Sequence, residues 1–115
     1  MGKLEDALYY YKTAIELEPD NSLFEYNCGV LFNTKSDYNE AVKILEKSIQ
    51  NNKENVYAYL ALGDALERLN QTKKAIYVYR DLLSLGIPVH GLKEKLAYLE
   101  TIYEQNVMHR SNEKN

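Results

Sequence analysis

The chain has 115 residues, of which 45% are hydrophobic and 27% charged, and its formal net charge is −3. This composition is typical of one soluble domain with a modest core, and the acidic balance argues against nucleic-acid binding, which normally needs a cluster of Lys and Arg. No apolar run approaches the roughly 20 residues that span a bilayer, and the one cysteine cannot form an internal disulfide. We therefore expect an intracellular, cytoplasmic protein with no membrane insertion.

Helix-breaking and capping residues divide the chain into segments. Pro19 ends the first helical pattern, and Asn21 or Ser22 can cap the second. Asn55 can cap the fourth, and Gly86 followed by Pro88 ends the fifth. The sequence therefore predicts six helices, over about residues 3–17, 22–34, 38–51, 56–69, 72–85 and 89–105. Residues 107–115 are polar and aperiodic, so we expect a disordered tail there.

A period of 34 residues relates three of these helices. Small and bulky residues recur at fixed offsets as Ala7-x3-Tyr11-x2-Ala14, Ala41-x3-Leu45-x2-Ser48 and Ala75-x3-Tyr79-x2-Leu82. Gly29 and Gly63 share the same separation, and a glycine inside a helix lets a second backbone approach closely. This period predicts stacked, antiparallel helix pairs.

The pattern resembles the tetratricopeptide repeat family. Its second-helix signature is matched by Ala7, Tyr11, Ala14 and Pro19, and its first-helix signature by Tyr59, Leu62, Gly63 and Leu66. The resemblance implies an all-α, right-handed α-solenoid over residues 1–106. Its parts are a half repeat (2–21), two repeats (22–55 and 56–88) and a capping helix (89–106), followed by the tail 107–115. Glu25, Lys53 and Leu82 depart from the family pattern, and we expect irregular geometry after Leu82.

In such repeats the first helices line a concave groove. The partner-binding groove implied here consists of Leu23, Tyr26, Asn27, Val30, Tyr57, Leu60, Asp64 and Tyr98. Clamps for the C-terminal carboxylate of heat-shock chaperones use five polar residues, of which only Asn27 is matched, because Tyr57 and Ala61 stand in place of Lys and Arg. The resemblance implies a non-catalytic scaffold that binds a protein or peptide, as a fragment of a longer array. The alternative is an accessory segment of an enzyme or co-chaperone whose catalytic domain lies outside this chain.

Catalytic and metal-binding patterns are absent from the sequence. His90 and His109 have no nucleophile or metal ligand near them, and Cys28 lies on an apolar stripe. We therefore expect no enzyme activity, no cofactor and no metal. The first helix has no partner helix before it, so we expect its apolar residues to be bare and to form a homo-oligomer. These self-association residues are Leu4, Leu8, Tyr11 and Ile15.

Overall fold

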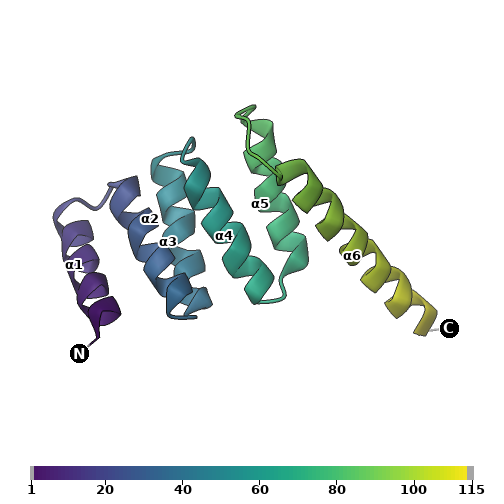
Figure 1. Cartoon of the computed structure of the whole chain (residues 1–115), viewed down its shortest axis with the longest axis horizontal. Coiled ribbons are helices and arrows are strands. Elements are labelled where there is room, and N and C mark those ends of the chain that lie inside the picture. Colours follow the sequence, from purple (N-terminus) through teal and green to yellow (C-terminus); the bar gives the residue numbers. More distant parts are fainter. Residues whose placement is uncertain (1, 114–115) are drawn as a thin grey trace.

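A computed structural model describes residues 2–113, which form six α-helices and, within that range, no strand. They are α1 (Lys3–Leu17), α2 (Ser22–Thr34), α3 (Tyr38–Asn51), α4 (Val56–Arg68), α5 (Thr72–Ser84) and α6 (Leu92–Glu113). Figure 1 shows α1 to α5 side by side in alternating directions, with α6 leaning away from the row. The molecule is elongated, measuring 54 × 34 × 20 Å. The predicted all-α fold of antiparallel helix pairs is confirmed.

The helices begin and end at capping and turn residues that also repeat every 34 residues. The side chain of Asn21 accepts a hydrogen bond from the Phe24 amide at 3.1 Å, and that of Asn55 accepts one from the Ala58 amide at 3.3 Å. Ser36 and Asn70 follow α2 and α4 with φ angles of 64° and 60°, which turns the chain back. The first five helices therefore begin and end within one residue of their predicted bounds.

The core lies between the members of each helix pair. Gly29 of α2 faces the side chain of Leu45 on α3, and Gly63 of α4 faces the ring of Tyr79 on α5. A Cβ atom at Gly63 would lie 2.6 Å from the Tyr79 hydroxyl oxygen and closer still to the ring. Only glycine allows these helices to approach so closely while Leu45 and Tyr79 stay buried.

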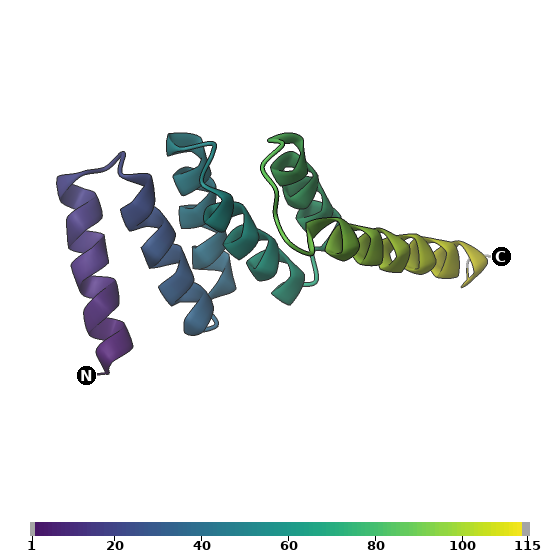
Figure 2. The same cartoon turned by 45° about the horizontal axis from the view of Figure 1, so that its top comes forward.

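The last helix differs from its prediction. It begins at Leu92 rather than near residue 89, and it continues through residues 107–113, where we expected disorder. That segment has no glycine or proline to end a helix, and polar composition alone does not prevent one. Residues 114–115 of the predicted tail lie outside the described residues. The backbone of α6 packs against α5 and not against α4 in the part of the chain that the structure describes, and Figure 2 shows α6 running away from the row of helices.

Candidate functional site

Seven of the predicted groove residues come from two neighbouring helices. The amide nitrogen of the Asn33 side chain on α2 donates a hydrogen bond to the Ala61 carbonyl oxygen on α4 at 3.1 Å. The ring centroids of Tyr26 on α2 and Tyr57 on α4 are 6.3 Å apart. These contacts hold the two helices side by side. We call the surface that they share the α2–α4 face; it consists of Leu23, Tyr26, Asn27, Val30, Tyr57, Leu60 and Asp64.

The α2–α4 face is open, apolar and aromatic. Tyr57 is 68% exposed and Leu23 is 59% exposed, whereas Tyr26 and Leu60 are half-buried. None of these residues lines the cavity beside the α5–α6 connection or the four smaller cavities described for residues 2–113. The carboxylate of Asp64 lies 3.8 Å from the Arg68 guanidinium, so the charges on this face are balanced. The face therefore presents mainly apolar surface and no cluster of cations.

Tyr98 comes from a helix whose backbone, in the described residues, does not pack against α4 as that of α2 does. It is an exposed residue of α6, and α6 reaches α4 through a side chain rather than through packed backbones. That link is the ion pair between the Lys95 ammonium and the Glu67 carboxylate, at 3.0 Å. Binding at Tyr98 therefore stays a prediction.

The predicted self-association residues of α1 lie on the side of the helix that faces α2, and not on a bare side as we expected. Leu8 is only 3% exposed, and Leu4, Tyr11 and Ile15 are half-buried. The expectation that this stripe is bare is wrong, because α2 packs against it. The helical spacing identified an apolar face correctly, but a helix in such a stack can have two neighbours. The exposed apolar residues of α1 include Tyr10 and Leu17. Self-association itself stays a prediction.

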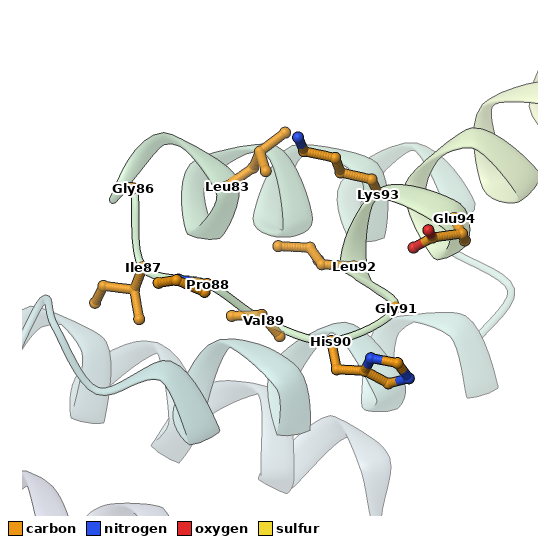
Figure 3. A pocket seen from close by; sticks show the side chains of 10 residues that line it. All are labelled: Leu83, Gly86, Ile87, Pro88, Val89, His90, Gly91, Leu92, Lys93 and Glu94. Carbon is orange, nitrogen blue, oxygen red and sulfur yellow. The ribbon is translucent and has the colours of Figure 1, made fainter.

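The connection between α5 and α6 borders an open cavity of about 830 Å³ (Figure 3). Its lining consists of Leu83 and residues 86–94. The imidazole of His90 is exposed and points away from Leu92. Gly86 and Gly91 have φ angles of 74° and 77°, a conformation that favours glycine and lets the chain turn twice. This cavity brings together no pair of residues suited to acid–base or nucleophilic chemistry.

Two further ionisable side chains, Cys28 and Tyr79, are buried in the core. Burial raises the pKa of the Cys28 thiol, and the charge of Lys12 lowers it only in part. Burial and a hydrogen bond to Glu67 raise the pKa of the Tyr79 hydroxyl well above its usual range. Among residues 2–113 we find no group of His, Cys, Asp and Glu side chains that could hold a metal ion. The same residues contain no helix long and apolar enough to cross a membrane.

Comparisons with known proteins agree with this architecture. Residues 34–85 match a family model described as tetratricopeptide repeat. A TPR repeat-containing protein of Methanocaldococcus jannaschii is 31% identical over 96 residues, which is 84% of this chain and 28% of that protein. The solved TPR domain of Arabidopsis OM64 is 27% identical with a TM-score of 0.78, covering 86% of this chain and 82% of that one.

The chain belongs to the tetratricopeptide repeat family. The first TPR domain of Spaghetti, solved with an HSP90 peptide, shares the fold with a TM-score of 0.80 at 18% identity, covering 90% of this chain and 84% of that one. Our tetratricopeptide chain thus spans about 28% of the length of its archaeal relative.

One departure from the tetratricopeptide pattern has a structural consequence that sequence reasoning missed. Glu25 stands where the family has an aromatic residue, and its side chain is fully buried. One carboxylate oxygen accepts a hydrogen bond from the Asn51 side chain at 2.7 Å, and the other lies 4.0 Å from the Lys47 ammonium. A buried carboxylate needs such partners, so Glu25 links α2 to α3. The replacement itself was visible in the sequence, but Asn51 and Lys47 carried no signal that they would meet it.

Proposed function

We propose that this tetratricopeptide repeat chain is a protein-interaction module that binds a peptide or a helix of a partner protein on the α2–α4 face. The observation that carries the proposal is the row of apolar side chains across two packed helices, with Tyr57 and Leu23 largely exposed. Tyrosine combines a large apolar ring with a polar tip, and it is enriched at protein interfaces. Because the face is continuous across α2 and α4, an extended segment or one face of a helix can contact both.

Solved relatives of this fold support peptide binding. The first TPR domain of Spaghetti was solved with the HSP90 peptide SRMEEVD, and the second TPR domain of human RPAP3 with the HSP70 peptide SGPTIEEVD. Those peptides end in acidic residues. On our chain Tyr57 and Ala61 stand where a carboxylate clamp has Lys and Arg, and cations at those places provide the strong, charge-assisted hydrogen bonds. We therefore propose a partner segment that is apolar rather than an acidic C-terminal tail.

The test uses a linear peptide selected from a random library against the complete chain. Its dissociation constant is measured by fluorescence anisotropy with the wild type, with Tyr57→Ala and with Tyr26→Ala. Loss of a central aromatic contact is worth about 2 kcal/mol, which is roughly 30-fold in affinity. Tyr77→Ala is the matched control, because Tyr77 is an exposed tyrosine of α5 outside the α2–α4 face.

Two results would contradict the proposal. One is a selected peptide whose affinity falls with Tyr77→Ala or Lys47→Ala and not with the α2–α4 variants. The other is saturable binding of the peptide SRMEEVD that is stronger than that of every selected apolar peptide, which would assign the face to acidic tails.

A further inference from the structure

One of the smaller cavities, of about 410 Å³, lies between α1 and α3. Both helices pack against α2 and, in the described residues, not against each other, so a furrow remains between them with α2 as its floor. All the lining residues fall within 12–47, so the cavity is bordered by neither end of the chain. Its volume is in the range of about 300–1,000 Å³ that is usual for small-molecule sites. We call it the α1–α3 cavity; its apolar lining consists of Ile15, Cys28, Phe32 and Ile44.

The apolar lining is separate from the α2–α4 face. Cys28 and Phe32 are buried residues of α2 that form the floor, and Ile15 and Ile44 are half-buried residues on the two walls. None of the four belongs to the α2–α4 face. A ligand in this cavity would therefore leave that face free.

Lysine side chains stand around the apolar lining, and two of them have no hydrogen-bonded acid. The Lys12 ammonium lies 5.4 Å from the centroid of the Phe32 ring and, within the described residues, has no ion-pair partner. The Lys47 ammonium is 4.0 Å from the buried carboxylate of Glu25, which is too long for a hydrogen bond. Both ammonium groups therefore keep N–H donors for a ligand.

The other charged residues of the lining are Lys43, Glu40 and Glu16. The Lys43 ammonium is 3.3 Å from the Glu40 carboxylate, so these two charges offset each other. Glu16 is exposed, one turn after Lys12 on α1. At the floor it is the charge of Lys12 that acts: burial raises the pKa of the Cys28 thiol, and the Lys12 ammonium lowers it in part. The same ammonium would stabilise another anion placed beside Cys28.

The equivalent furrow, between α3 and α5 over α4, carries the opposite charges. A displacement of 34 residues puts Glu46 in the place of Lys12 and Asp81 in the place of Lys47. The exchange of two lysines for two acids reverses the sign of the ligand charge that the furrow attracts. The first furrow is therefore the one suited to an anion, and the second provides a control within the same molecule.

We propose that the α1–α3 cavity binds a small amphipathic carboxylate, with its apolar body over Phe32 and its carboxylate bound by Lys12 and Lys47. Burial of the apolar body supplies affinity, and ammonium groups donate charge-assisted hydrogen bonds to a carboxylate. A free small molecule fits better than a segment of a protein, because charged side chains surround the apolar lining, and charged residues are depleted at the core of protein interfaces.

The probe is octanoate, titrated into the complete chain while the backbone amide chemical shifts are recorded by NMR. Octanol and octylamine are the matched controls, because they have the same length without a charge and with the opposite charge. We expect octanoate to bind about fivefold more tightly than octanol, which is the effect of one exposed ion pair, and octylamine to bind less tightly than octanol. Butyrate keeps the carboxylate and loses most of the apolar body, so it should bind at least about tenfold more weakly than octanoate.

The shifted amides and variants of the rim locate the site. Saturable shifts are expected at the apolar lining of the α1–α3 cavity and not around Leu62, the residue of α4 that corresponds to Cys28. Lys12→Gln should weaken octanoate binding about threefold, and Glu16→Gln should strengthen it about twofold. Both residues are exposed, so both variants keep the fold, and neither should alter the affinity for octanol. Lys73→Gln, which removes an exposed lysine of α5 outside the cavity, should leave the octanoate affinity unchanged.

Three outcomes overturn the proposal. One is the absence of a saturable shift with octanoate at millimolar concentration. Another is equal affinity for octanoate and octylamine, since the lysines would then not select the charge of the ligand. The third is a set of shifts on the α2–α4 face or around Leu62 in place of the α1–α3 cavity, which would put the ligand elsewhere on the chain.

Discussion

Replacing Gly63 by alanine tests whether the close approach of α4 and α5 determines the residue at this position. In an open helix the change stabilises by about 1 kcal/mol, because glycine is the poorer helix former. Here the new methyl group would overlap the Tyr79 ring and hydroxyl. The ring is buried, and its hydroxyl donates a hydrogen bond to the Glu67 carboxylate at 2.7 Å, so it cannot move aside freely.

Overpacking of this kind costs about 1–3 kcal/mol. Because a hydrogen bond to Glu67 holds the Tyr79 ring in place, we expect a destabilisation near the upper end of this range, about 3 kcal/mol. After the gain in helix propensity, Gly63→Ala should lower the free energy of unfolding by about 2 kcal/mol. Urea denaturation followed by circular dichroism measures this change, with equal slopes for both proteins.

A double-mutant cycle separates the two contributions. In a Tyr79→Ala background the whole ring is gone, so Gly63→Ala should stabilise by about 1 kcal/mol, a coupling of about 3 kcal/mol. A leucine at position 79 would not serve, because a Cβ atom at Gly29 would overlap Leu45 at the equivalent place. Ala61→Gly, in the same helix, measures how much the difference in helix propensity between alanine and glycine changes the stability of this chain. A stabilising Gly63→Ala in the wild-type background would refute the reasoning, since Tyr79 would then have room to move.

Three further predictions concern the fold. Ala75 on α5 is fully buried, so Ala75→Leu should lower stability by about 1–3 kcal/mol; an unchanged melting temperature would mean that this packing register is misplaced. Ser36 has a φ of 64°, and Ser36→Gly should raise the free energy of unfolding by about 0.5–1 kcal/mol, with a lower urea midpoint as the contrary result. Burial raises the pKa values of Cys28, Tyr59 and Tyr79 above 9.0, 10.0 and 10.0. Above these values the unfolded chain releases protons that the folded chain retains, so stability should fall as pH rises, by up to about 1.4 kcal/mol per pH unit for each group. Urea midpoints measured at increasing pH should show this fall, and Tyr79→Phe should make it less steep.

The bounds of the first five helices could be predicted from the sequence, because residues close to each boundary determine where the helix begins or ends. Pro19, Asn21, Asn55 and Gly86 act on the few residues around them, and the structure places each at a helix boundary. The end of α6 could not be read in this way, because no breaker marks it and a polar composition is compatible with both helix and disorder.

Which of the predicted groove residues come to lie side by side could be predicted only where the 34-residue period holds. Tyr26 and Tyr57 meet because α2 and α4 occupy equivalent places in successive helix pairs. Tyr98 does not join them, because α6 does not take the corresponding place beside α4. On α1 the sequence showed an apolar stripe containing Leu8 but not which neighbour covers it. Which neighbouring helix covers the stripe depends on tertiary packing, and the spacing of apolar residues on one helix does not determine that packing.

The backbone of α6 packs against α5 but not against α4 in the described residues, and this bears on how the molecule opens. In a stack whose helices contact mainly their neighbours, the stability of each part is the sum of local contributions. Separation of α6 would break its packing on α5 and the ion pair between Lys95 and Glu67, with the rotation absorbed at Gly86 and Gly91. It would leave the contacts among α1, α2, α3 and α4 in place. Backbone amides of α6 should therefore exchange with solvent through a low-energy local opening, and those of α3 and α4 only when the whole stack unfolds.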